Sequence, residues 1–136
     1  MGTWDVGPFH NDNAADFAGR LDQAPPAERV ALVRAALTRA GEAEGYLEGD
    51  DGEEAVAAAA LVAAQRAGGE PVDPSYGPKG EVPSFPAELD AVAVRSLDRV
   101  LGAESELAEL WDDSGEGAIW RERIARLRGV LVGEAG

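Results

Sequence analysis

The chain contains no cysteine and only one histidine, His10. Without cysteine it can form no disulfide, thiolate metal site or cysteine nucleophile. One histidine cannot supply the clusters of a zinc enzyme or the paired Glu-x-x-His motifs of a di-metal bundle. A Ser-His-Asp triad would have to use His10, and no Gly-x-Ser-x-Gly motif is present to display its serine. Phosphate-loop and dinucleotide motifs are also missing, so we expect no metal, no cofactor and no catalytic residues.

Basic residues are scarce as well. The chain has 12 Lys and Arg against 26 Asp and Glu, which gives a net charge of −14. This balance argues against nucleic acid and anionic membranes as partners, and it permits a basic protein partner. The longest apolar run, residues 55–64, is mostly alanine and too short to span a bilayer. The first residues lack the basic and apolar regions of a secretion signal, so we expect a soluble, cytoplasmic protein.

Helical periodicity dominates the remaining sequence, and no stretch alternates as a strand would. With 136 residues and 45% apolar residues, the chain is long enough for one domain with a substantial core. We therefore predict an all-α single-domain bundle of five to six helices over residues 1–136, with an N-terminal aromatic loop and one long Pro/Gly-rich loop. Helices are expected from about residue 14, and over residues 26–40, 52–67, 86–102, 103–111 and 118–132.

The segment 52–67 is apolar around nearly its whole circumference, so it is predicted to be the central helix. Capping boxes are predicted at Asn13 with Asp16 and at Asp51 with Glu54. The acidic runs 50–54 and 112–116 lack the spacing of an EF-hand and are interpreted as solvated caps and turns. In the segment 103–111, the pattern predicts that Leu107, Leu110 and Trp111 face the core.

The first seventeen residues combine two aromatics, a Gly-Pro turn and a run of helix-capping residues. Two interpretations are open: a loop held down by its aromatic side chains, or a recognition site around a helix start. Negative charge in this segment disfavours a phosphate ligand. Together with Tyr76 from the Pro/Gly-rich loop, the candidate binding residues are Trp4, Asp5, Phe9, His10, Asn11, Asp12 and Tyr76.

Residues 68–86 contain five of the eight prolines and four glycines. An irregular segment of this length is either a functional loop or a connection that crosses the bundle. The last predicted helix is basic, in contrast to the acidic chain as a whole, because residues 118–132 contain four arginines and one glutamate. These arginines either pair with acidic neighbours across the bundle or form a basic patch for an acidic partner or for self-association.

Several pieces of the sequence resemble a known bacterial family. The opening MGTW and the segment around Phe9, Asn11 and Asp12 that leads into the first helix are similar to the start of domain-of-unknown-function family 4259. The stretch 105–111 and Trp120 with the arginine-rich helix after it also look like that family. Many members have an acidic residue where this chain has His10. The resemblance implies a helical fold and no particular activity.

Two classes of function remain. The first is a protein-interaction module, inhibitor or immunity-like, that binds a basic partner, because the chain is small and acidic and has no catalytic constellation. The second is a small-ligand binder or hydrolase with a pocket between the N-terminal loop and the 68–86 loop. A flat acidic face favours the first class, and a pocket lined by aromatic and polar groups favours the second. The sequence does not determine the oligomeric state.

Overall fold

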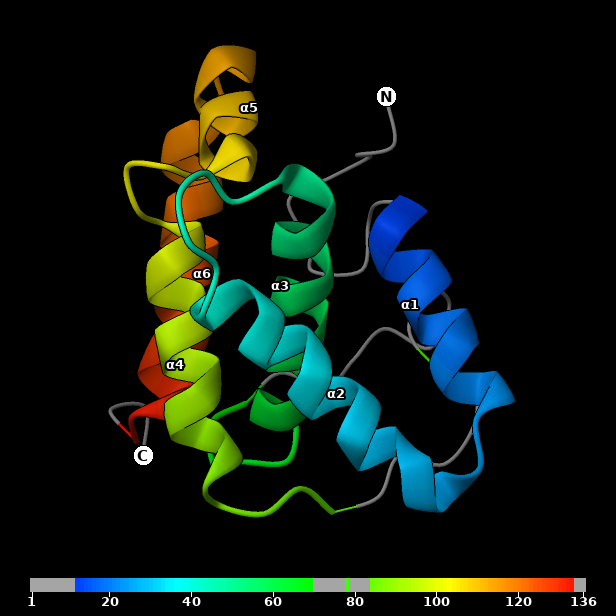
Figure 1. Cartoon of the computed structure of the whole chain (residues 1–136). Coiled ribbons are helices and arrows are strands. Elements are labelled where there is room, and N and C mark those ends of the chain that lie inside the picture. The colour runs from blue at the N-terminus through cyan, green and yellow to red at the C-terminus, as the bar shows by residue number, and fades with distance from the viewer. Residues whose placement is uncertain (1–11, 70–77, 79–83, 134–136) are drawn as a thin grey trace.

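The computed structural model describes residues 12–69, 78 and 84–133. It contains six helices: α1 (Asp12–Gln23), α2 (Pro26–Gly41), α3 (Gly49–Ala63), α4 (Leu89–Val100), α5 (Glu106–Ser114) and α6 (Gly117–Leu131) (Figure 1). These ranges contain no strand, only an isolated bridge between Leu47 and Ser105. The prediction of an all-α bundle is confirmed. The N-terminal loop and most of the 68–86 segment lie outside the described residues.

Helix α3 is the centre of the bundle, as its composition predicts. It contacts all five other helices (Figure 1), and every residue from Ala55 to Ala63 is buried. Alanine side chains let neighbouring helices approach closely, whereas a helix with one polar face has to turn that face to water. No helix in the described ranges is long and apolar enough to cross a bilayer.

Each of three surrounding helices buries one stripe of apolar residues at helical spacing. Helix α1 buries Ala14, Phe17, Ala18 and Leu21. Helix α2 begins at Pro26, as predicted, because proline at the first helical position loses no helical hydrogen bond. It buries Val33 and Leu37, and α4 buries Leu89, Ala93 and Leu97. Figure 1 shows α2 crossing the front of α3, with α4 and α6 on its left and α1 on its right.

The start of α3 differs from the prediction. The helix begins at Gly49, so Asp51 lies inside its first turn, and the residue before the helix, Glu48, makes no side-chain cap. The Gly49 N–H instead donates to Glu106 Oε1 of α5 at 2.6 Å. The predicted capping box is therefore wrong, because a carboxylate from a distant segment takes the position that a local cap would fill.

The capping box predicted at Asn13 is also wrong. Asn13 lies inside α1, and its Nδ2 donates to Glu53 Oε1 at 2.7 Å and to Asp50 Oδ1 at 3.0 Å. Glu53 is a buried carboxylate with 8% of its surface exposed, and such a group needs hydrogen-bond donors. Asn13 therefore links the first turn of α1 to the first turn of α3.

Helix α5 begins and ends about three residues later than predicted. Ser105 precedes it in an extended conformation and its hydroxyl accepts a hydrogen bond from the Ala108 N–H, so Ser105 is the N-cap. Leu107, Ala108 and Trp111 are buried, and the Trp111 ring stacks on Trp120 of α6 with ring centroids 6.4 Å apart. The expectation that Leu110 faces the core is wrong, because 55% of its surface is exposed.

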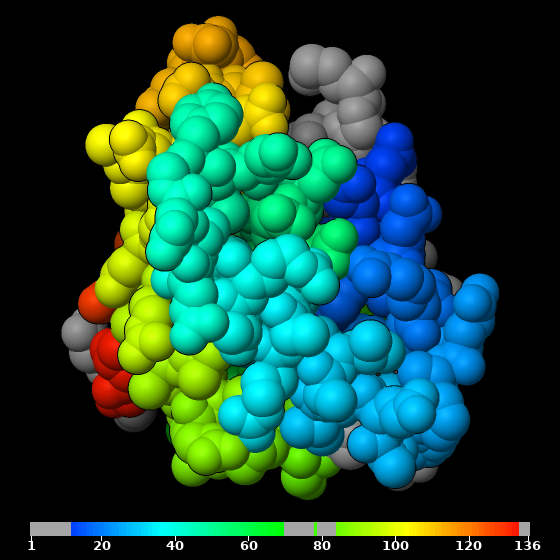
Figure 2. Space-filling view, viewed as in Figure 1, coloured from blue at the N-terminus to red at the C-terminus, as the bar shows by residue number. Residues whose placement is uncertain are grey.

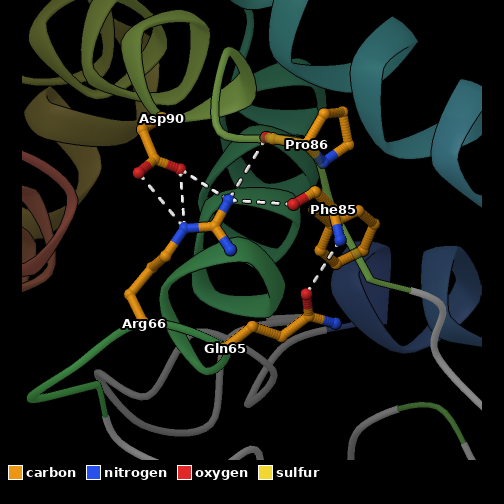
Figure 3. Close-up of polar contacts among 5 residues, drawn as sticks. All are labelled: Gln65, Arg66, Phe85, Pro86 and Asp90. Carbon is orange, nitrogen blue, oxygen red and sulfur yellow. Dashed lines mark hydrogen bonds and ion pairs between the residues drawn. The ribbon is translucent and has the colours of Figure 1, made fainter.

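A clamp around Arg66 joins the end of α3 to the start of α4 (Figure 3). Arg66 Nε donates to both carboxylate oxygens of Asp90, at 2.9 and 3.1 Å, and its Nη2 donates to the carbonyls of Phe85 and Pro86. The Gln65 side chain accepts a hydrogen bond from the Phe85 N–H at 2.9 Å. Arginine suits this position because its guanidinium presents several donors in one rigid plane.

Two fully buried serines provide a matched test of side-chain hydrogen bonding. We expect Ser105→Ala to lower the free energy of unfolding by about 0.5–2 kcal/mol, because it removes the cap of α5. Ser96 Oγ has no hydrogen-bond partner in the described part of the chain. We therefore expect Ser96→Ala to raise the free energy of unfolding by up to about 1 kcal/mol, because alanine buries no hydroxyl. Urea denaturation measures both, and equal losses in the two variants would contradict the assignment.

Candidate functional site: an acidic end of the bundle

The strongest charge asymmetry in the molecule comes from two short stretches. Residues 42–54 contain seven acidic residues and residues 104–116 contain six, and neither stretch contains lysine or arginine. Half of the 26 acidic residues of the chain therefore belong to these two stretches. We call them together the acidic end of the bundle.

The two stretches are distant in sequence and adjacent in space. The Leu47 N–H donates to the Glu104 carbonyl at 2.8 Å, and the Glu106 N–H donates to the Leu47 carbonyl at 2.9 Å. The Tyr46 hydroxyl donates to Glu109 Oε1 at 3.1 Å. In Figure 2 the teal connection 42–48 meets the yellow and orange chain of α5 at the upper part of the molecule. The fold thus combines two acidic stretches into one surface.

Arg99 of α4 holds the two connections together from the inside. Its Nη1 donates to the carbonyl of Glu104 at 3.1 Å and its Nε to the carbonyl of Ala43 at 3.4 Å. Its Nη2 donates to the carbonyl of Gly45. Gly45 has φ +72°, a conformation that favours glycine. Arg99 donates to backbone carbonyls, and among the described carboxylates of the acidic end none forms an ion pair with it.

Most carboxylates of the acidic end are exposed: Glu42, Glu44, Glu48, Asp50, Glu104, Glu109, Asp112, Asp113 and Glu116. Among the described residues, ion pairs from this surface are formed by Asp112 with Arg121, and by Glu54 with Arg20 and Arg39. The other exposed carboxylates have no such pair within the described ranges. The surface is therefore strongly anionic, and its repulsion is balanced by backbone and side-chain hydrogen bonds.

The electrostatics of two side chains reflect this environment. Desolvation, the hydrogen bond to Glu109 and the nearby charges of Glu109 and Glu106 raise the pKa of Tyr46 above 10.0, so its hydroxyl remains a donor. The hydrogen bonds from Arg121 lower the pKa of Asp112 below 3.8, against a smaller opposing effect of desolvation. Within the described ranges, no group of three acidic or histidine side chains has an arrangement that could hold a metal ion.

The residues predicted from sequence to form a site are mostly outside the described part of the chain: Trp4, Asp5, Phe9, His10, Asn11 and Tyr76. Asp12 is described; it is exposed at the first position of α1. Its neighbour Asn13 bonds to Asp50, so the start of α1 lies beside the acidic end. The pocket predicted between the N-terminal loop and the 68–86 loop depends on segments outside the described residues.

The exposed glutamates of the 42–48 connection and of α5 were not predicted from the sequence as functional candidates. The signal was present, because two 13-residue stretches without a basic residue stand out in the charge pattern. The runs 50–54 and 112–116 were each interpreted as separate caps and turns. Their membership in one surface follows from the pairing of residue 47 with residue 105, which no local pattern indicates.

The arginines of α6 were expected either to pair with acidic neighbours across the bundle or to form a basic patch, and the structure shows the pairing for some of them. Arg121 pairs with Asp112 of α5 and Arg128 pairs with Asp98 of α4, whereas Arg126 pairs with Glu122 of its own helix. Arg121 also lies over the Trp120 ring, 5.9 Å from its centroid, and donates to the Leu101 carbonyl. Two of the four predicted arginines therefore pair with a neighbouring helix.

We expect Arg99→Lys to lower the free energy of unfolding by about 1–3 kcal/mol, because an ammonium group cannot reach three divergent carbonyls and hydrogen bonds from a charged donor are lost. Arg95→Lys, an exposed change on the same helix, should alter it by less than about 0.5 kcal/mol. Thermal and urea denaturation measure both. Equal stability of the two variants would show that Arg99 does not hold the connections together.

The Asp112–Arg121 pair gives a pH-dependent prediction. Because the pKa of Asp112 is lower in the folded protein than its ordinary value of 3.8, the pair stabilises the fold above that pH. This stabilisation is lost as the pH falls below 3.8 through the folded pKa. Asp112→Asn should therefore melt at a lower temperature than wild type at neutral pH, and the difference should shrink on acidification. A difference that is constant with pH would contradict the prediction.

Comparison with known proteins agrees with the sequence resemblance. Neither the search of curated proteins nor the search of solved structures gives a match. The family model described as "Domain of unknown function (DUF4259)" matches residues 2–123, which include all of α1 to α5 and the first half of α6. The chain therefore belongs to the DUF4259 family.

Proposed function

We propose that the protein is a single-domain, cytoplasmic interaction module, inhibitor or immunity-like, that binds a basic protein partner through the acidic end of the bundle. The observation that carries the proposal is the joining of residues 42–54 and 104–116, which contain 13 acidic and no basic residues, into one surface. A surface of this charge speeds encounter with a basic partner and disfavours neutral or acidic ones.

The way this surface is built supports binding rather than catalysis. Its carboxylates are spread over two connections and the outer side of α5, and most are exposed. A general acid or base requires a carboxylate in an environment that shifts its pKa towards neutral pH. The hydrogen bonds from Arg121 shift the pKa of Asp112 in the opposite direction, below 3.8. A set of exposed carboxylates spread over a surface suits electrostatic recognition of a basic partner.

The same charge argues against nucleic acid and anionic membranes as partners. Nucleic acid and anionic membrane surfaces both require a positive field from the protein. Two of the four arginines of α6 contribute little to such a field, because Arg121 and Arg128 pair with Asp112 and Asp98. The remaining class is a protein whose own surface is rich in lysine and arginine.

Charge reversal at the acidic end tests the proposal. The probe is a synthetic peptide of alternating arginine and serine, and its dissociation constant is measured by fluorescence anisotropy at low and at physiological salt. We expect Glu44→Lys/Glu104→Lys to weaken binding about tenfold, equivalent to about 1.4 kcal/mol, and we expect salt to weaken wild-type binding.

The matched control is Glu28→Lys/Glu88→Lys. It changes the net charge by the same amount and alters exposed glutamates near the starts of α2 and α4, at the opposite end of the bundle in Figure 1. We expect this control to weaken binding by less than about threefold, since screening limits distant charges. Equal losses in the two variants would mean that net charge alone attracts the peptide, and would refute a site at the acidic end.

A further inference from the structure

The acidic end contains exposed apolar side chains as well as charge. Four large hydrophobic residues are exposed in the described part of the chain, and two of them, Tyr46 and Leu110, belong to this surface. Tyr46 is 50% exposed and Leu110 is 55% exposed. They are neighbours in the structure, because the Tyr46 hydroxyl bonds to Glu109, the residue before Leu110.

The outer face of α5 arranges these groups in a regular order. Glu106, Glu109, Leu110 and Asp113 recur at positions i, i+3, i+4 and i+7, which is the spacing of one helix face. Leu107, Ala108 and Trp111 occupy the opposite, buried face. Leu110 is therefore a single exposed apolar side chain on α5 with carboxylates before and after it.

The surface is held in place before any partner binds. Ser105 caps the start of α5, and Glu106 is fixed by its hydrogen bond from the Gly49 N–H. The Trp111–Trp120 stack fixes the buried side of the helix. The hydrogen bond to Glu109 restricts the Tyr46 ring. Such preorganisation reduces the entropy lost on binding.

We propose that Tyr46, Glu109, Leu110 and Asp113 form a recognition strip for a basic amphipathic segment of the partner, in which an apolar side chain is flanked by arginine or lysine. This inference rests on the proposed function and specifies its partner. The flanking cations meet Glu109 and Asp113, and the apolar side chain packs on Leu110. The Tyr46 ring can receive an arginine through a cation–π contact.

Charge and apolar contact have different roles in such an interface. Long-range attraction raises the association rate and selects basic partners. Desolvated apolar and aromatic contacts supply most of the binding energy and slow dissociation. A partner segment with arginines alone satisfies the first requirement, whereas a segment that also carries leucine satisfies both. The strip therefore favours, among partner segments of equal positive charge, those that also carry an apolar side chain.

The test uses two synthetic peptides of equal length and charge. One has arginine and leucine at helical spacing, and in the other each leucine is replaced by serine. We expect wild-type protein to bind the leucine peptide about tenfold more tightly than the serine peptide. Leu110→Ser should reduce this preference to less than about twofold, and it should leave the affinity for the serine peptide unchanged. Circular dichroism checks that the variant folds.

Val132→Ser is the matched control, because Val132 is also exposed but follows the far end of α6. It should keep the full preference for the leucine peptide. Equal binding of the two peptides by wild type, or an equal loss in both variants, would overturn the strip and leave the acidic end as a charge-based site. Failure of wild type to bind either peptide would refute the proposed function together with the strip. A change in self-association with Leu110→Ser, without a change in peptide preference, would identify a second copy as the occupant and overturn the proposal.

Discussion

The close packing of α3 against five other helices is the constraint on which the rest of the structure depends. A helix surrounded on all sides can expose no polar face and must allow its neighbours to approach closely. The buried stretch from Ala55 to Ala63 satisfies both conditions. Gly52 is also buried, in the first turn of α3, where an added Cβ would lie 3.4 Å from Leu107 of α5, which is van der Waals contact.

The position of the acidic end follows from this arrangement. Because α3 is central, its first turn has to meet the elements that surround it, and both Asn13 of α1 and Glu106 of α5 bond there. The connection that leads into α3 therefore lies against the connection that leads into α5. Residues 42–48 contain three glutamates and residues 104–109 contain three more, so the packing of apolar helices brings together charges that repel one another.

Hydrogen bonds to the backbone hold this acidic surface together, and most of its exposed carboxylates form no ion pair within the described ranges. Arg99 bonds to backbone carbonyls and residues 47 and 105 pair through their backbones, so these contacts do not occupy the exposed carboxylates. On α5 the same surface leaves Leu110 in water, although the sequence pattern would allow it to be buried. We propose that this fixed anionic surface, with apolar side chains in it, binds a basic protein segment.

The sequence by itself determined the helical class and the central helix, because these follow from local periodicity and from the alanine content of residues 55–64. It also contained the charge of each acidic stretch. Only the tertiary structure decided which acidic stretches lie together, which carboxylate caps α3 and whether the Leu110 side chain is buried or exposed. A capping box is recognised from neighbours in sequence, whereas Glu106 reaches Gly49 across 57 residues, a relation that exists only after the helices have packed.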